Sequence, residues 1–136
     1  MNKYGYIKVA AAIPRVKVAD CTHNAQQIIS LINQANERGV NVISFPELSI
    51  TSCSCGDLFR QSLPIAINDS LYDCAAIVAR GEILGVIPKS YIPTSGTMND
   101  SRWFTSGDKL DATEILLAGN YVQADKYLLF DIDGVR

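Results

Sequence analysis

The sequence predicts an α/β fold that opens with a strand–helix–strand unit. Residues 6–13, YIKVAAAI, form an apolar run typical of a buried strand. A helix follows, which Asp20 or Thr22 can cap and which runs to about Arg38. Residues 40–45 then form a second apolar run. Because a helix connects the two strands, we expect them to pair in parallel and to be covered by that helix.

The helix is supported by the spacing of its apolar side chains and by its end signal. Gly39 follows at the position where helices commonly stop, because glycine adopts the left-handed backbone conformation needed there. The apolar residues that recur near helical spacing are Ala25, Ile28, Ile29, Ile32 and Ala35.

The composition limits the class of protein. A chain of 136 residues and 14.8 kDa is long enough for one domain with its own core. Its net charge of −2 gives no electrostatic footprint for nucleic acid. No apolar run approaches the roughly 20 residues of a membrane span. We therefore expect a cytoplasmic protein that binds neither nucleic acid nor a membrane.

The four cysteines favour reduced thiols without a metal. Cys21, Cys53, Cys55 and Cys74 have no paired metal-ligand spacing and no partner clusters of histidine. Cys21 beside the helix start and Cys74 within a predicted strand are interpreted as core thiols. A small metal or redox protein built on Cys53 and Cys55 has little support.

Short strands and tight turns are predicted for the second half of the chain. The Arg-Gly dipeptide at residues 80–81 predicts a hairpin, and Asn-Asp at residues 68–69 predicts an earlier turn. Residues 91–108 contain many turn formers and predict a long ordered loop, anchored by Trp103 and Phe104. The predicted strands are residues 65–67, 70–79, 82–87, 114–117 and 126–132.

Two places in the chain predict an incomplete domain. Around residues 61–64 the connection to the strand at 65–67 has room for about one helical turn, whereas a parallel crossover needs a dozen or more residues. Residues 133–134 predict a hairpin turn after which only two residues follow. We therefore expect residues 1–136 to be part of one domain.

Two charged residues stand in the same sequence context. Glu47 follows an apolar run and Pro46, and Lys89 follows an apolar run and Pro88. Ligands bind at strand ends in open α/β sheets, and a carboxylate beside an ammonium group can move a proton or stabilise a polar transition state. The pattern alone favours a surface ion pair.

Three stretches carry a resemblance to a known family. They are FPELSITSCSCGDLF at residues 45–59, RGEILGVIPKSYIPT at residues 80–94 and RWFTSGDKL at residues 102–110. Together they resemble the N-terminal glutaminase domain of glutamine-dependent NAD synthetases, within the carbon–nitrogen hydrolase (nitrilase) superfamily. The resemblance implies an αββα sandwich, of which this chain would hold a fraction.

The resemblance also implies a Glu–Lys–Cys amidase mechanism. Glu47 would be the general base that activates a cysteine thiolate, and Lys89 would stabilise the oxyanion of the tetrahedral intermediate. The substrate would be glutamine, and no cofactor would be needed for the amidase step. The ammonia would pass to a synthetase domain that uses ATP and Mg²⁺ and is absent from this sequence. The family also implies a homo-oligomer.

Departures from the family pattern limit these expectations. No residue of this chain matches the catalytic cysteine, so we expect the chain as given to be inactive toward glutamine. Cys55 is interpreted as structural, and Cys53 stands where the family usually has a tyrosine near the pocket. A second glutamate of the family falls on Thr97, and Asp100 is the nearest carboxylate; Cys53 and Asp100 are therefore candidate substrate-binding residues. The alternative is a catalytically dead nitrilase-like module for binding or assembly.

Overall fold

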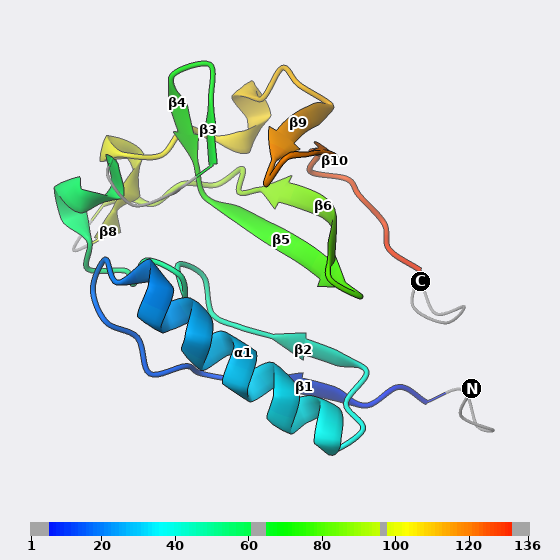
Figure 1. Cartoon of the computed structure of the whole chain (residues 1–136). Helices are drawn as coiled ribbons and strands as arrows, with labels where there is room; N and C mark the ends of the chain where they lie inside the picture. The colour runs from blue at the N-terminus through cyan, green and yellow to red at the C-terminus, as the bar shows by residue number, and fades with distance from the viewer. Residues whose placement is uncertain (1–5, 61–64, 96–97, 132–136) are drawn as a thin grey trace. The chain divides into compact units, whose positions relative to one another are not determined.

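The computed structural model describes residues 6–60, 65–95 and 98–131 (Figure 1). The chain divides into two compact units, residues 1–62 and 63–136. The first unit contains a parallel strand–helix–strand arrangement, and the second contains antiparallel hairpins.

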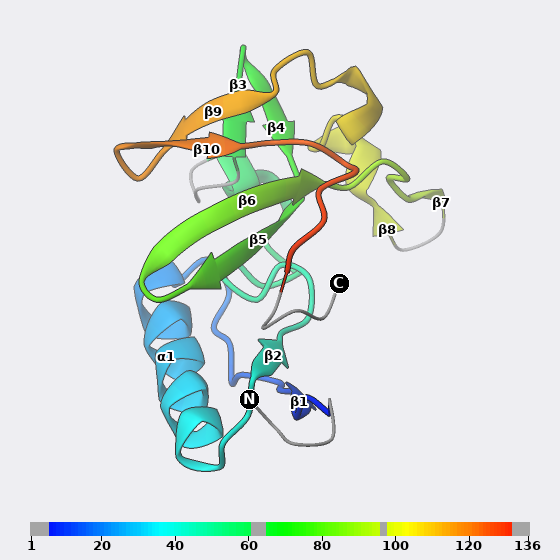
Figure 2. The same ribbon diagram turned by 90° about the vertical axis from the view of Figure 1, so that its right-hand side faces the viewer.

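The first unit confirms the predicted strand–helix–strand order. Strand β1 (Val9–Ala11) pairs in parallel with β2 (Val42–Ser44), and helix α1 (Cys21–Glu37) connects them. The helix lies along one side of the strand pair (Figures 1 and 2). The predicted strand at residues 6–13 is longer than the observed β1. Pro46 explains part of the difference, because proline has no N–H with which to extend the ladder beyond β2.

The ends of α1 follow the predicted signals. Asp20, not Thr22, is the N-cap, and its carboxylate accepts a hydrogen bond from the backbone N–H of His23 at 3.0 Å. Gly39 has a φ of +68° and donates its N–H to the carbonyl of Asn36 at 2.9 Å. A one-turn 3₁₀ helix, η1 (Gly56–Arg60), ends the described part of this unit. The connection at residues 61–64, which the sequence predicts to be too short for a parallel crossover, lies outside the described residues.

The second unit begins with two hairpins. Strands β3 (Ile65–Ile67) and β4 (Ser70–Tyr72) flank a turn in which both central residues have positive φ angles, as in a type I′ turn. Strands β5 (Cys74–Ala79) and β6 (Glu82–Pro88) flank a turn of the same kind. Both predicted turns are therefore confirmed.

The prediction of one strand over residues 70–79 is wrong. Asp73 separates β4 from β5, and the two strands pair with different partners. The buried Asp73 carboxylate lies close to the Lys89 ammonium group, and β5 begins with the next residue.

The described parts of the predicted long loop after Lys89, residues 91–95 and 98–108, contain short elements. These are β7 (Thr94–Ser95), β8 (Met98–Asn99), η2 (Asp100–Arg102) and η3 (Gly107–Lys109). Phe104 is only 4% exposed, in agreement with its predicted anchoring role. Thr97 lies outside the described residues.

The last strands differ in part from the prediction. Strand β9 (Glu114–Leu117) is confirmed, and it pairs with β10 (Asn120–Gln123), which the sequence did not predict. Residues 126–131, the described part of the predicted strand 126–132, form no strand. The turn predicted at residues 133–134 lies outside the described residues.

Residues 126–131 contact β6 through side chains and form no strand. A Cβ atom on Gly85 of β6 would lie 2.9 Å from side-chain atoms of both Leu128 and Phe130. The side chains of Leu128 and Phe130 therefore pack against β6 at its glycine, whereas Tyr127 and Leu129 are 78% and 89% exposed. Just before this segment, Ala124 forms an isolated parallel bridge with Val86, and the N–H of Asp125 donates to the carbonyl of Val86 at 3.2 Å.

The core of the second unit lies between β6 and the β9–β10 hairpin (Figure 2). Its buried members are Val86, Ile115, Val122 and Ala124. Since β6 ends at Pro88, the core fixes the strand that presents Lys89.

Candidate functional site

Glu47 lies in a turn that follows β2, in the first unit. The strand ends at Ser44, and Glu47 is exposed. Leu48 and Ser52 have φ angles of +56° and +73°, so the chain after Glu47 turns sharply. The N–H of Ser52 closes the turn by donating to the carbonyl of Leu48 at 2.7 Å.

A buried asparagine of α1 holds this turn. Asn24 has no exposed surface. Its Nδ2 donates to the carbonyls of Lys17 and Ile50, each at 2.8 Å, and its Oδ1 accepts from the N–H of Lys17 at 2.7 Å. One amide therefore joins the segment after β1, the helix and the turn that carries Glu47. Asn24 was not predicted as a functional residue, although a polar residue one turn before Ile28 on the apolar face of the helix was a usable signal.

Two cysteines follow Glu47 and differ in environment. Cys53 is exposed, whereas Cys55 is buried with its Sγ 2.6 Å from the carbonyl oxygen of Thr51. This placement agrees with the structural role expected for Cys55. The substrate-binding role of Cys53 stays a prediction.

Lys89 follows β6 in the second unit, and its backbone is held on both sides. Its N–H donates to the carbonyl of Asp73 at 2.9 Å, and its carbonyl accepts from the N–H of Gly107 at 2.9 Å. The predicted strand end is therefore a fixed point of the fold.

The side chain of Lys89 is paired with a buried carboxylate. Its Nζ lies 3.6 Å from Oδ2 of Asp73. The Lys89 side chain is 28% exposed and that of Asp73 only 10% exposed, so the pair lies at the edge of the interior. Asp73 was not predicted as a functional residue, although a carboxylate inside a predicted strand was a signal.

Cys74, next to Asp73, has an unreactive thiol. Burial and, to a lesser extent, the Asp73 charge raise the pKa of Cys74 from 9.0 to about 12. Because the thiolate is the nucleophilic form, Cys74 stays protonated and inert near neutral pH.

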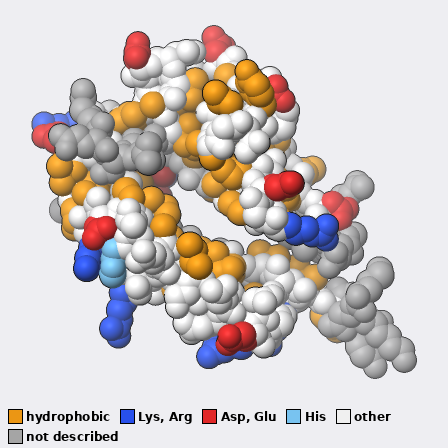
Figure 3. Space-filling view, in the orientation of Figure 1, with side chains coloured by type: hydrophobic (Ala, Val, Ile, Leu, Met, Phe, Trp, Pro, Cys, Tyr) orange, Lys and Arg blue, Asp and Glu red, His pale blue; other side chains and the backbone are white. Residues whose placement is uncertain are grey.

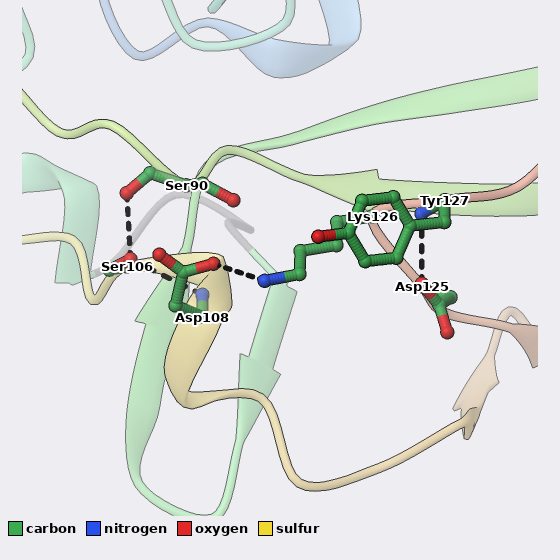
Figure 4. A network of polar contacts seen from close by, with 6 residues as sticks. All are labelled: Ser90, Ser106, Asp108, Asp125, Lys126 and Tyr127. Carbon is green, nitrogen blue, oxygen red and sulfur yellow. Dashed lines mark hydrogen bonds and ion pairs between the residues drawn. The ribbon is translucent and has the colours of Figure 1, made fainter.

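The turn at residues 105–109 supports the chain just after Lys89 (Figure 4). Ser106 Oγ donates to the carbonyl of Ser90 at 2.7 Å and accepts from the N–H of Asp108 at 3.2 Å. Asp108 in turn pairs with Lys126, with 2.6 Å between Oδ1 and Nζ. The hydrogen bond from Lys126 lowers the pKa of Asp108.

Gly107 is required at this turn because the backbones approach closely. A Cβ atom on Gly107 would lie 2.8 Å from the carbonyl oxygen of Pro88. This separation is shorter than real Cβ contacts, so only glycine fits without movement of the Lys89 strand end. Sequence reasoning treated Gly107 as a turn former and missed this contact.

Asp100 lies at the start of η2, farther along the same loop. Its carbonyl accepts hydrogen bonds from the N–H groups of Trp103 and Phe104, at 3.0 and 2.9 Å. Asp100 is half-buried, and its role toward a substrate stays a prediction.

Glu47 and Lys89 belong to different compact units, and each is described within its own unit. Their predicted cooperation therefore stays a prediction. Among the described residues, no group of three or more His, Cys, Asp or Glu side chains could hold a metal ion. Within the same residues, no helix combines the length and the hydropathy of a membrane span.

Comparison with known proteins relates the chain to a family. Residues 8–73, which include Glu47, match the carbon–nitrogen hydrolase family. The chain is similar to the glutamine-dependent NAD(+) synthetase of Mycobacterium leprae, with 30% identity over 79% of this chain and 20% of the relative. The synthetase of the same name from Mycobacterium bovis is 28% identical over 94% of this chain and 23% of its own length. The chain thus spans about a fifth of the length of these relatives.

A solved structure shows a similar fold. The crystal structure of a glutamine-dependent NAD(+) synthetase from Cytophaga hutchinsonii superposes with a TM-score of 0.83. The identity is 22%, and the match covers 93% of this chain and 26% of that one. The predicted fold class, part of a nitrilase-like α/β fold, is confirmed, as is the resemblance to this glutaminase domain.

Proposed function

We propose, on the basis of this similarity to carbon–nitrogen hydrolases, that the chain forms part of a glutamine amidohydrolase site that supplies ammonia. Glu47 would act as the general base and Lys89 as the stabiliser of the oxyanion. The observation that carries the proposal is the match over residues 8–73, which includes Glu47. Lys89 lies outside that match, and its support is its fixed position after β6.

The proposed chemistry assigns one task to each group. Glu47 takes the proton of a cysteine thiol, and the thiolate attacks the side-chain carbonyl carbon of glutamine. The Lys89 ammonium group stabilises the negative oxygen of the tetrahedral intermediate. The proton held by Glu47 passes to the leaving nitrogen, so ammonia departs and a thioester remains, which water hydrolyses to glutamate. We propose that the nucleophilic cysteine is supplied from outside these 136 residues.

The proposal extends to the whole protein that contains this chain. The relatives are named as glutamine-dependent NAD(+) synthetases, so we propose that the released ammonia serves an ATP- and Mg²⁺-dependent synthetase domain. The intact mass of the native polypeptide tests this part. A mass well above 14.8 kDa supports it, whereas a mass of 14.8 kDa contradicts it.

Replacement of Glu47 tests the general base. In the native polypeptide, Glu47→Gln should lower the rate of ammonia release from glutamine by about 100-fold or more, because the thiol loses its base. Glu37→Gln, an exposed carboxylate at the end of α1, is the matched control and should leave the rate unchanged. An unchanged rate in Glu47→Gln would remove Glu47 from the mechanism.

Replacement of Lys89 tests the oxyanion role. Lys89→Ala should lower kcat by about 100-fold with a smaller effect on KM, because the charge acts mainly in the transition state. Lys109→Ala removes an exposed lysine from the nearby η3 turn and should have no effect. A loss confined to KM would assign Lys89 to substrate binding.

A second candidate function is an assembly module without catalysis. Leu116 and Tyr121 are cross-strand neighbours in the β9–β10 hairpin and are 66% and 76% exposed. Apolar side chains are also visible at many places on the face drawn in Figure 3, and exposed apolar pairs of this kind favour contacts with other proteins. The assembly function would require a native chain of 14.8 kDa that is inactive toward glutamine and forms an oligomer. If the double variant Leu116→Glu, Tyr121→Glu dissociates that oligomer, the assembly function replaces the amidohydrolase function.

A further inference from the structure

The buried Asp73 carboxylate requires an explanation because burial of a charge is unfavourable unless the charge is paired. Asp73 lies at the junction of β4 and β5, and its side chain is 10% exposed. Its location interrupts what would otherwise be a continuous apolar strand. A residue that serves packing alone would be apolar at this position.

Asp73 contacts Lys89 through two different groups. Its carbonyl accepts the Lys89 N–H at 2.9 Å, and its Oδ2 lies 3.6 Å from Lys89 Nζ. The first contact fixes the backbone of Lys89, and the second attracts its ammonium group toward the Asp73 carboxylate. A lysine side chain has four rotatable carbon bonds, so the backbone contact alone would leave the ammonium group able to move.

We propose that Asp73 is a positioning residue for Lys89, which holds the ammonium group in one place and orientation after β6. The functional part of this proposal rests on the proposed oxyanion role of Lys89. A preorganised charge stabilises a transition state better than a mobile one, because no reorganisation is needed during the reaction. A misplacement of about 1 Å can reduce a rate by up to about 100-fold.

The arrangement has a cost as well as a benefit. A carboxylate beside the ammonium group weakens the field that an oxyanion would experience. The remaining exposure of Lys89, 28%, leaves part of the group available to a substrate. The positioning effect should outweigh the weakened field, so removal of the Asp73 charge should slow the reaction.

The first test is kinetic and uses the native polypeptide. Asp73→Asn keeps the size of the side chain and the backbone contact but removes the charge, and kcat for glutamine hydrolysis should fall about tenfold with KM nearly unchanged. Asp73→Glu restores the charge and should recover part of the loss. Asp111→Asn, an exposed carboxylate, is the control and should leave kcat unchanged. A wild-type kcat in Asp73→Asn would overturn the proposal.

The second test does not depend on activity. Lysine acetylation by acetic anhydride, followed by peptide mass spectrometry, should modify Lys89 at least about tenfold more slowly than the exposed Lys109 in the unchanged protein. Asp73→Asn should accelerate acetylation of Lys89 severalfold and leave Lys109 unaffected. Equal rates for the two lysines in the unchanged protein would overturn the positioning role, even if the variant failed to fold.

The two tests separate this inference from the proposed function. If Lys89→Ala leaves activity unchanged while acetylation of Lys89 responds to Asp73→Asn, the oxyanion role is wrong and the tether is real. If Lys89→Ala abolishes activity while Asp73→Asn changes neither kcat nor acetylation, the proposed function stands and the positioning role is wrong.

Discussion

Glu47 and Lys89 have the same sequence context, an apolar strand followed by proline, but the fold supports them differently. In the turn that carries Glu47, the side chain of Asn24 donates a hydrogen bond to the carbonyl of Ile50, three residues after Glu47. The backbone of Lys89 is itself bonded on both sides, to Asp73 and to Gly107. Similar sequence patterns therefore indicate where a charged residue emerges and do not indicate how firmly it is held.

The difference follows from the kind of structure around each residue. In the first unit a parallel pair of three-residue strands is followed by a long turn after β2, which accepts hydrogen bonds from the Asn24 side chain and, at 2.9 Å to the carbonyl of Thr51, from the N–H of Ala19. In the second unit the loop at residues 105–109 returns to the end of β6 and satisfies the Lys89 backbone directly. Replacement of each supporting residue tests this comparison.

The largest effect is expected at Asn24. Asn24→Ala removes three part-buried hydrogen bonds to the backbone of Lys17 and Ile50 and leaves a cavity where the fully buried amide was, so the free energy of unfolding should fall by about 3 kcal/mol. Urea unfolding measures the loss, and amide exchange should increase at residues 48–52. Gln26→Ala on the exposed face of the same helix is the control, with a change below about 0.5 kcal/mol. A small loss in Asn24→Ala would mean that the Glu47 turn is held by other contacts.

Gly107 tests the direct support of Lys89. Gly107→Ala places a Cβ atom 2.8 Å from the Pro88 carbonyl oxygen, and relief of this contact should cost about 2 kcal/mol. The amide signal of Lys89 should shift in a nitrogen–proton correlation spectrum. Gly119→Asn adds a side chain in open space at a φ of +82°, which asparagine tolerates better than other non-glycine residues, and should cost less. An unperturbed Lys89 amide in Gly107→Ala would show that the strand end is adaptable.

The contribution of Cys74, next to Asp73, to the free energy of unfolding should depend on pH. The folded protein binds the thiol proton more tightly than the unfolded chain, because the pKa of Cys74 is raised from 9.0 to about 12. Its stabilising contribution is therefore present below pH 9 and is lost as the pH rises toward 12. The difference in free energy of unfolding between the unchanged protein and Cys74→Ala should shrink between pH 8 and pH 11. A constant difference would contradict the raised pKa of Cys74.

The smallest effect is expected at the exposed pair of Asp108 and Lys126. The hydrogen bond from Lys126 lowers the pKa of Asp108, so its contribution is present above the ordinary pKa and is lost as the pH falls through the lowered value. Lys126→Ala should raise the pKa of Asp108 toward 3.8 in a carboxyl-carbon NMR titration. Lys109→Ala should leave that pKa in place. An unchanged pKa of Asp108 in Lys126→Ala would contradict the pairing.

Local signals in the sequence predicted a large part of the fold. The two ends of α1 were predicted to within about one residue. The signals were the Asp20 cap, Gly39 and the spacing of apolar residues, and each of them acts over about one helical turn. The two-residue turns at 68–69 and 80–81 were recognisable because their residue types suit positive φ angles.

The sequence could not reveal features that depend on distant contacts. Residues 126–131 have the apolar character of a strand but form none, and Gly85 allows the side chains of Leu128 and Phe130 to pack against β6. The positions of Glu47 and Lys89 after their strands were predictable from the two prolines. Their supports, Asn24 and Asp73, stand out in the sequence as polar residues within apolar patterns, but no local pattern shows which residues they contact, since those partners lie 26 and 16 residues away.

The arrangement of strands has a consequence for the order of folding. The hairpins β3–β4, β5–β6 and β9–β10 join residues close in sequence, and such hairpins form in about 1–10 μs. Strands β1 and β2 pair residues 33 positions apart, such as Val9 with Val42, and must wait for α1 to bring them together. The strand end that carries Lys89 should therefore acquire its native hydrogen bonds before the one that leads to Glu47.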